Sequence, residues 1–456
     1  MPPTIFVLFG ATGDLARRMV LPAFAALAVN DLMPEQWVLI GNGRKDEDDA
    51  WFADHVRDVL DDDAQFAAVH EHLMFAGNGF SVDDAGDLPA TVARAREQVG
   101  ADALLVHYIA LPPSTFEPYV RALDAHDLVD GARVVFEKPY GTSPESFRHL
   151  EDVVHRVLDE EQIYRLDHFL GKEATQNLHV LRFTNAIIGD VWCNRGVAQV
   201  QIDVPETLDI DDRAGFYDAT GATLDMVVTH LFQVAAEVAM EPPASLEAAD
   251  LQAARESIIA KFRPIDPAEV VRGQFEGYRD LDGVARNSRT ETFVAARLWV
   301  DTPRWRGVPF LLRTGKRLHR THQSVSLILR DPAGPLTALP RPGNVLRFSL
   351  DGSGALELRM VAKAPGVGLN LDAATASVPI SAIDGTPPLP PYVRLIHDVL
   401  SGDRSLVTRP DGLAHVWKVA QPVLSAPGRP KPYAPGSWGP AAAAKLAAPD
   451  GWLLGQ

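Results

Sequence analysis

The 456 residues include a single cysteine, Cys193. That scarcity excludes a disulfide scaffold and any zinc site built mainly from thiols, because each needs several cysteines. One thiol fits a reducing compartment. The segment around it, Val191–Asn194, carries no signature of a nucleophilic cysteine. We therefore expect Cys193 to be an ordinary packing or surface residue.

Positive charge is also in short supply. Lysine and arginine total 43 against 60 aspartate and glutamate residues, so the net charge is −17. A nucleic-acid partner is disfavoured, because such proteins carry a basic footprint. The 46% hydrophobic and 23% charged residues are typical of a globular protein. A chain of this length buries a large core without help from disulfides or a structural metal.

Long hydrophobic runs are missing as well. No segment approaches the roughly 18 apolar residues that a membrane-spanning helix needs. The longest helical apolar stretch, Leu231–Met240, is interrupted by Gln233 and Glu237. The first apolar run, Ile5–Phe9, is short, and no basic residue precedes it, unlike a secretory signal. The expectation is a cytoplasmic protein without a membrane partner.

What the chain does have is regular alternation over its first third. Short apolar runs typical of buried parallel strands lie at residues 4–9, 37–40, 104–111 and 133–136. Helix-like segments separate these runs. Strands that alternate with helices indicate a parallel sheet with crossover helices. We therefore predict an α/β, Rossmann-like domain over residues 1–165.

The pattern changes beyond that point. Residues 173–184 and 223–240 are predicted as longer helices. From about residue 290 the chain alternates period-2 runs with turns, which is typical of an antiparallel sheet with one covered face. There is no internal repeat and no long linker. We predict that residues 166–456 form an α+β domain with a large, mostly antiparallel sheet.

The first predicted strand runs directly into Gly10-Ala-Thr-Gly-Asp-Leu-Ala16, and a helix follows. A strand, a glycine-rich turn and a helix are the usual setting for phosphate at a helix N-terminus. Gly10 and Gly13 let the backbone approach a pyrophosphate, and Thr12 offers a hydroxyl group. The spacing differs from the common G-x-G-x-x-G, so a tight turn without a ligand stays as the alternative.

The end of the second strand bears on the choice of dinucleotide. NAD enzymes usually place an acidic residue there for the ribose hydroxyls. Here Arg44 occupies that place, and a guanidinium suits a 2′-phosphate. We therefore predict NADP rather than NAD, with a plain surface charge as the alternative for Arg44. The acidic run that follows, Asp46–Asp49, is predicted as the solvated start of a helix.

A second cluster lies near the predicted domain boundary, where Asp167, His168 and Lys172 fall within six residues. The segment Arg165-Leu-Asp-His-Phe-Leu-Gly-Lys-Glu173 resembles the active-site signature of the glucose-6-phosphate dehydrogenase family. Further resemblances come in family order and span nearly the whole chain. They are Gly10–Ala16, Glu137–Gly141, Gly215–Asp218, Ala239–Pro243, Val308–Lys316 and Gly436–Pro440.

The resemblance implies an enzyme that oxidises the C1 hydroxyl of glucose 6-phosphate and passes hydride to NADP. The product would be 6-phosphogluconolactone, at the entry to the oxidative pentose phosphate pathway. The same resemblance implies a substrate-binding and dimerisation role for the second domain, in a homodimer or homotetramer. No metal is implied. The nearest ligand-like motif, His70-Glu71-His72, is too short and isolated for a metal site.

His230 matches the catalytic histidine of the family, and an imidazole is suited to accept the hydroxyl proton as hydride leaves. Asp167 matches the carboxylate that orients this ring and stabilises the imidazolium, as in a catalytic triad. Without the resemblance, a structural histidine and a helix-cap aspartate would be the plainer interpretations.

The remaining candidates contact substrate or cofactor by resemblance. His168 and Lys172 match the ligands of the 6-phosphate, and Lys138 matches the lysine near both sugar and nicotinamide. The bond from Lys138 to Pro139 is expected to be cis. The other predicted sugar-binding residues are Glu206, Asp225 and Lys316. The predicted cofactor-binding residues are Gly10, Thr12, Gly13, Asp14, Leu15, Arg44 and Lys138. A basic cluster that draws in anions is also predicted, from Arg313, Lys316, Arg317 and Arg320.

The chain departs from the family pattern at four positions close to these residues in the sequence. Phe169 stands where the family usually has tyrosine, and Leu224, Val228 and Thr229 replace the usual Arg, Gln and Asn. Losing polar groups beside a hydroxyl-rich ligand weakens or redirects recognition. Two alternatives therefore stay open: a paralogue that oxidises a related sugar phosphate or also uses NAD, and an inactive NADP-binding regulator. The joint retention of Asp167, His230, Lys138 and Lys172 argues against the second, because a regulator needs no such base machinery.

Overall fold

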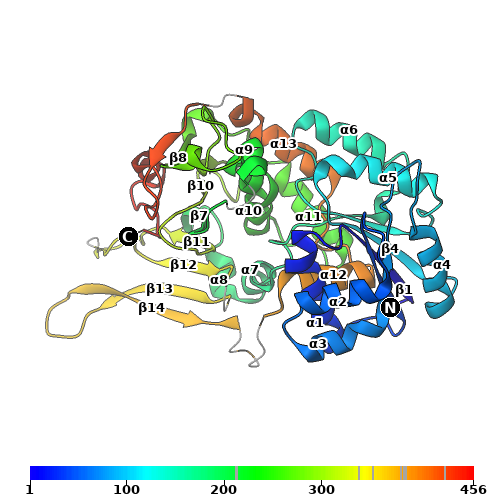
Figure 1. Ribbon diagram of the computed structural model, residues 1–456. Helices are drawn as coiled ribbons and strands as arrows, with labels where there is room; N and C mark the ends of the chain where they lie inside the picture. The colour runs from blue at the N-terminus through cyan, green and yellow to red at the C-terminus, as the bar shows by residue number, and fades with distance from the viewer. Residues whose placement is uncertain are drawn as a thin grey trace. The chain divides into compact units, whose positions relative to one another are not determined.

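The computed structural model describes residues 1–210, 214–336, 339–351, 354–380, 383, 388–425 and 428–455. The chain divides into two compact units (Figure 1). The first comprises Met1–Gly171 together with Ser245–Gln252 and Leu389–Pro410, and the second comprises the rest. The two short segments of the first unit come from the part of the chain that sequence periodicity places in the second domain.

The first unit is built on a six-stranded parallel sheet with the order β3-β2-β1-β4-β5-β6. The strands are β1 (Thr4–Phe9), β2 (Trp37–Asn42), β3 (Leu73–Ala76), β4 (Leu104–Ile109), β5 (Arg133–Phe136) and β6 (Ile163–Arg165). Phe9 pairs with both Asn42 and Ile109, so β1, β2 and β4 end at one edge. The strand order reverses between β1 and β4, which is where such sheets bind dinucleotides. The predicted Rossmann-like architecture is confirmed.

Helices cover this sheet (Figure 1). They are η1 (Ala16–Val20), α1 (Leu21–Val29), α2 (Asp49–Val59), α3 (Asp63–Val69), η2 (His70–His72), α4 (Leu88–Val99), η3 (Pro113–Thr115), α5 (Phe116–Ala125), α6 (Pro144–Val154), η4 (Glu160–Gln162) and α12 (Pro391–Ser401). The apolar side of α12 explains why so distant a segment belongs here. Leu395, Ile396 and Val399 are buried in the same core as Leu8 and Phe24. Burying these side chains stabilises the unit by roughly 1.5–3 kcal/mol each.

The second unit contains a nine-stranded sheet with the order β14-β13-β12-β11-β7-β10-β9-β8-β15. The strands are β7 (Val197–Pro205), β8 (Val270–Phe275), β9 (Phe293–Leu298), β10 (Phe310–Gly315), β11 (Ser324–Leu329), β12 (Val345–Ser349), β13 (Leu356–Lys363), β14 (Leu371–Val378) and β15 (Lys431–Tyr433). Neighbours are antiparallel except for the parallel pairs β7–β10 and β8–β15. The predicted large, mostly antiparallel sheet is confirmed.

Helices of this part are α7 (Glu173–Thr184), α8 (Ala186–Val191), α9 (Ala214–Ala222), η6 (Thr223–Leu231), α10 (Phe232–Ala239), η7 (Pro267–Glu269), η8 (Tyr278–Asp280), α13 (Pro410–Ser425) and η10 (Ala441–Ala447). Helix α11 (Ala248–Ile259) begins in the segment Ser245–Gln252 of the first unit and continues into the second. Helix α7 matches the predicted bounds. The other predicted helix, residues 223–240, is composite: η6 is a π-helix, and α10 continues it as an α-helix. π-Helical turns are rare and occur often at functional sites.

The hairpin β13–β14 forms one edge of the sheet (Figure 1). Most of its residues are half-buried or exposed, and the exposed ones include apolar side chains such as Met360 and Val378.

Cys193 is a buried free cysteine. No helix in the described part of the chain is long and apolar enough to cross a membrane.

Candidate active site

The glycine-rich loop lies at the end of β1, beside the reversal of strand order. Gly10 has a φ of +75°, and a Cβ there would come within 2.9 Å of the Ala110 carbonyl oxygen. Glycine is therefore required at this turn. The Gly13 N–H donates to the Gly10 carbonyl at 2.9 Å, which closes the turn before η1 begins. Thr12 and Asp14 are exposed on the loop, and Leu15 is half-buried.

Arg44 follows β2 on the same edge of the sheet and is exposed. Its charge acts on Tyr119 of α5: burial raises the pKa of this phenol, and Arg44 opposes the rise. The acidic run behind Arg44 is occupied structurally. Asp48 caps α2 by accepting the Trp51 N–H at 2.8 Å, and Asp49 is bound by Arg94 at 2.8 Å. The prediction of a helix start for this run is confirmed.

Lys138 follows β5, and its bond to Pro139 is cis, as expected. The ammonium of Lys138 lies 6.0 Å from the ring centroid of Phe169, next to His168. The fold thus brings two separate motifs of the sequence together in the first unit. Just before Lys138, the carboxyl group of Glu137 is buried and accepts a hydrogen bond from the Tyr108 hydroxyl.

Asp167 begins the turn that presents His168. Its carboxylate accepts the Phe169 N–H at 2.8 Å, and its carbonyl accepts the Leu170 N–H at 3.0 Å. Asp167 is 2% exposed, whereas the imidazole of His168 is half-buried and stacks on Tyr392 with ring centroids 6.3 Å apart. The turn therefore holds a buried carboxylate and a partly accessible imidazole next to each other.

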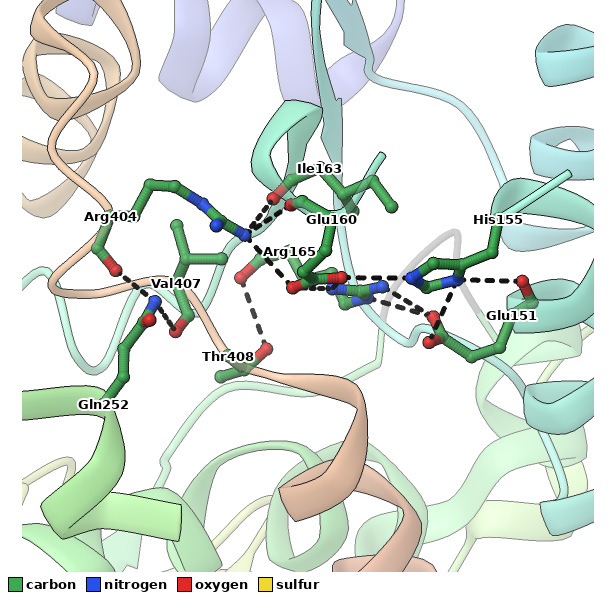
Figure 2. Close-up of polar contacts among 9 residues, drawn as sticks. All are labelled: Glu151, His155, Glu160, Ile163, Arg165, Gln252, Arg404, Val407 and Thr408. Carbon is green, nitrogen blue, oxygen red and sulfur yellow. Dashed lines mark hydrogen bonds and ion pairs between the residues drawn. The ribbon is translucent and has the colours of Figure 1, made fainter. Parts of the chain in front are cut away.

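Figure 2 shows how the strand leading into Asp167 is anchored by a buried arginine. Arg165 is 2% exposed, and its guanidinium donates to Glu151 at 2.8 Å and to Glu160 at 3.0 Å. His155 lies between the same two carboxylates, 3.3 Å from Glu160 and 3.6 Å from Glu151. Charged pairs of this kind stabilise the strand only because each partner is bonded.

The outer edge of β6 is bound by the segment Leu389–Pro410 (Figure 2). The Arg165 carbonyl accepts the Thr408 N–H at 3.2 Å and the Thr408 hydroxyl at 3.3 Å. Arg404 donates to the Ile163 carbonyl at 3.2 Å, and Gln252 donates to the Arg404 carbonyl at 2.6 Å. Side chains from the distant segments therefore occupy the place that a further strand would take.

In the second unit, η6 carries His230 and Asp225. His230 is 2% exposed and Asp225 is half-buried. The hydroxyl of Thr229 donates to the Asp225 carbonyl within the helix. Leu224 and Val228, two of the departures from the family pattern, are 5% and 3% exposed.

The ends of the parallel strands β7 and β10 bring two further candidates together. Glu206 follows β7, Lys316 follows β10, and their side chains form an ion pair. The Glu206 N–H also donates to the Gly315 carbonyl at 3.0 Å, which fixes the register of the two strand ends. Lys172 lies at the start of α7 and donates to the amide oxygen of Gln323.

The prediction of a basic cluster that draws in anions is wrong for most of the residues assigned to it. Arg313 is 2% exposed and paired with Asp203 through two hydrogen bonds, one of them 2.8 Å long. Arg317 is paired with Asp209, and Lys316 with Glu206. These carboxylates neutralise the charges, so no open patch of four cations is formed.

Sequence reasoning gave no role to Glu137, Tyr217 or Tyr392. The first two stand inside family-like motifs, and burial of a carboxyl or phenol beside candidate ligands marks them only once the fold is known. Asp167 and His168 belong to the first unit, and Lys172 and His230 to the second. The pairing of Asp167 with His230 stays a prediction.

Comparison with known proteins covers almost the whole chain. The model of the NAD-binding domain of glucose-6-phosphate dehydrogenase matches residues 7–177, and the model of its C-terminal domain matches residues 179–453. Glucose-6-phosphate 1-dehydrogenase 1 of Mycobacterium tuberculosis is 35% identical over 452 residues, which cover 97% of this chain and 94% of that protein.

Two solved structures are similar to this chain over almost its full length. The crystal structure of glucose-6-phosphate 1-dehydrogenase from Mycobacterium avium has a TM-score of 0.88 and 35% identity, and covers 99% of this chain and 98% of its own. A structure of a glucose-6-phosphate dehydrogenase in complex with its substrate glucose-6-phosphate has a TM-score of 0.91 and 26% identity. It covers 100% of this chain and 99% of its own.

Proposed function

The chain belongs to the glucose-6-phosphate dehydrogenase family, and from that premise we propose that it oxidises glucose 6-phosphate at C1 to 6-phosphogluconolactone with NADP as hydride acceptor. The observation that carries the proposal is the match of both family domains over residues 7–177 and 179–453. The chain also retains the residues that the reaction needs: a base, a partner for the base, and cations for the phosphate.

His230 is proposed as the base that accepts the C1 hydroxyl proton, and Asp167 as the carboxylate that orients its ring and stabilises the imidazolium. His168 and Lys172 bind the 6-phosphate, since a phosphate near neutral pH is close to a dianion. Glu206, Asp225 and Lys316 bind the sugar hydroxyls. In this scheme burial of Asp167 strengthens its effect, because charges interact more strongly away from water.

The dinucleotide site is proposed at the loop after β1 and at Arg44. The turn that would hold the pyrophosphate requires glycine at position 10, since a Cβ there would meet Leu111 at 2.7 Å. Thr12, Gly13, Asp14 and Leu15 complete the loop, and Lys138 reaches the nicotinamide end. When bound, NADP supplies the hydride acceptor; the protein holds the phosphates and the reacting sugar.

Replacing Arg44 with alanine is expected to raise the KM for NADP⁺ by about tenfold or more, because a charge-assisted phosphate contact contributes roughly 1.5–3 kcal/mol. Any NAD⁺ activity should be unchanged, since NAD lacks the 2′-phosphate. Steady-state kinetics with both cofactors measure this. Arg148→Ala, at an exposed arginine of α6, is the matched control. Equal effects on both cofactors would count against the assignment.

The substrate is tested by adding glucose 6-phosphate and NADP⁺ to the pure protein and following absorbance of the reduced nicotinamide. Mannose, galactose and glucosamine 6-phosphates, and NAD⁺, are assayed in parallel because Leu224 and Val228 replace polar residues of the family. Faster turnover of another sugar phosphate would replace glucose 6-phosphate in the proposal. No turnover of any of them would refute it.

A homodimer or homotetramer formed through the sheet of the second unit is part of the proposal, and so is a cytoplasmic location. The exposed edge hairpin β13–β14 supports the assembly, because long unpaired edges tend to be covered. Light scattering on wild type and on Met360→Asp tests it: a mass of one chain for wild type would contradict the assembly.

A further inference from the structure

The helix that carries Asp225 and His230 starts just after an interruption of the helical backbone. Gly221, with a φ of +67°, is a non-helical residue near the end of α9, two positions before η6 begins. The next two N–H groups both donate to Glu291: that of Ala222 to its carbonyl at 3.0 Å, and that of Thr223 to its carboxylate at 3.0 Å. The first N–H groups of a helix have no acceptor within the helix, so Glu291 supplies what η6 lacks.

The charge of Glu291 suits this place. The N-terminal end of a helix carries a partial positive charge, and a carboxylate there is favoured. The carboxylate also fills the space beside Gly221, because a Cβ on that glycine would come 3.0 Å from the Glu291 oxygen. One side chain therefore fixes both the interruption and the start of the helix.

The residue after Glu291, Thr292, is hydrogen-bonded to the backbone of Lys316. The carbonyl of Thr292 accepts the Lys316 N–H at 2.9 Å. The Lys316 carbonyl in turn accepts the Tyr433 hydroxyl at 2.7 Å. Consecutive residues, Glu291 and Thr292, thus join the start of η6 to the end of β10, where Lys316 pairs with Glu206.

The loop that precedes Glu291 is itself held in place by Asp218 of α9. The Tyr278 hydroxyl donates to the Asp218 carboxylate at 2.9 Å, and Ser288 donates to the same group. The Thr290 hydroxyl donates to the Asp218 carbonyl at 2.6 Å. Glu291 therefore emerges from a fixed support rather than from a loose loop.

Tyr217 is a buried phenol that is influenced by the charges of several of these groups. Its phenol is 4% exposed, and the Lys316 ammonium lies 5.9 Å from the centre of its ring. Burial, and then the charge of Asp225, raise the pKa of Tyr217, and Glu291 and Glu206 add to the rise. The carboxylates assigned to the sugar and that of Glu291 thus act electrostatically on the same phenol.

We propose that Glu291 is a positioning residue for the sugar-binding side of the second unit. It holds η6, with Asp225 and His230, at a fixed distance from the strand end that carries Lys316. It acts through these residues and needs no contact with the substrate. The assignment of the sugar-binding residues rests on the proposed function; the capping of η6 does not.

The test compares Glu291→Ala with Glu291→Gln, which keeps an oxygen that accepts the Thr223 N–H. Displacements of about 1 Å in an active site cost up to about 10²-fold in rate. The kcat/KM for glucose 6-phosphate should therefore fall by about 10- to 100-fold in the alanine variant, while the KM for NADP⁺ stays unchanged. Glu291→Gln should recover most of the loss. Glu276→Ala, at an exposed carboxylate of the same unit, is the control and should equal wild type.

Amide hydrogen exchange of the peptide 222–231 provides a readout that needs no turnover. Glu291→Ala should speed exchange in this peptide by about tenfold and leave α13 unchanged, because loss of a cap opens the helix end. Gly221→Ala, whose methyl group would press on the carboxylate, should do the same if the first variant does not fold. Unchanged exchange would overturn the inference. Absence of wild-type turnover would instead refute the proposed function.

Discussion

Replacing His230 with alanine is expected to lower kcat by about 10²- to 10⁴-fold, the range typical of a lost general base. The KM for NADP⁺ should hardly change, because the proposed cofactor residues lie in the first unit. The acid side of the pH profile of kcat should also disappear, since it reports protonation of the base. Stopped assays with high enzyme concentration measure the residual rate.

The control is His415→Ala, which removes an imidazole of α13 that is hydrogen-bonded to the Phe262 carbonyl at 3.2 Å. Asp167→Asn should lower kcat less than His230→Ala does, and the Asp167→Asn variant should still fold. A His230→Ala variant with the kcat of wild type would contradict the assignment of the base, whatever the identity of the sugar.

The second large effect concerns stability. Glu237 lies in α10, the continuation of η6, and is 2% exposed. Its carboxylate accepts from Arg255 at 2.5 Å and from His179 of α7. Burial alone would raise the pKa of Glu237, but the charges of Arg255 and His179 lower it to about 2. The group is therefore ionised in the folded protein at any ordinary pH.

Glu237→Gln is expected to destabilise the protein by about 3–5 kcal/mol, because it breaks an ion pair whose two side chains are both almost fully buried. Urea unfolding at pH 7 measures the change. Glu241→Gln is the control: Glu241 binds Arg304 at 2.7 Å, but its side chain is 55% exposed, and such pairs contribute about 0–1 kcal/mol. Similar losses in both variants would contradict the argument.

The sign of the pH dependence follows from the same pair. The folded-state pKa of Glu237 lies below its ordinary value of 4.5, so the folded protein binds its proton less readily than the unfolded chain. The stability that this carboxylate contributes is complete above pH 4.5 and is lost as the pH falls toward 2. The difference in the free energy of unfolding between wild type and Glu237→Gln should therefore become smaller as the pH falls.

Sequence alone predicted the elements whose cause is local. The hydrogen bond from Gly13 to Gly10 and the cap that Asp48 forms with Trp51 join residues close in sequence, and both the turn and the helix start were predicted. Family resemblance supplied His230 and Asp167, which periodicity would have left as structural residues. The two alternation patterns predicted a parallel sheet followed by a large, mostly antiparallel sheet, but they did not give the six and nine strands of the structure.

Features that depend on distant partners were out of reach. Arg313 reads as part of a basic surface, yet its partner Asp203 lies on a neighbouring strand 110 positions earlier in the chain. Arg165 belongs to the recognised signature, but Thr408, which binds its carbonyl, lies 243 positions further on. Only the tertiary fold brings such groups together, so the local spacing of residues in the sequence does not predict these contacts.

The interleaved path of the chain has a consequence for biosynthesis. Helix α12 supplies core residues to the first unit, and Thr408 and Arg404 close the edge of β6. A nascent chain released only as far as the signature therefore still exposes the apolar surface that α12 covers. Domains generally fold as units during synthesis, N-terminal ones first. Here completion of the dinucleotide-binding unit must wait until the ribosome has delivered residue 410, after most of the second unit has already emerged.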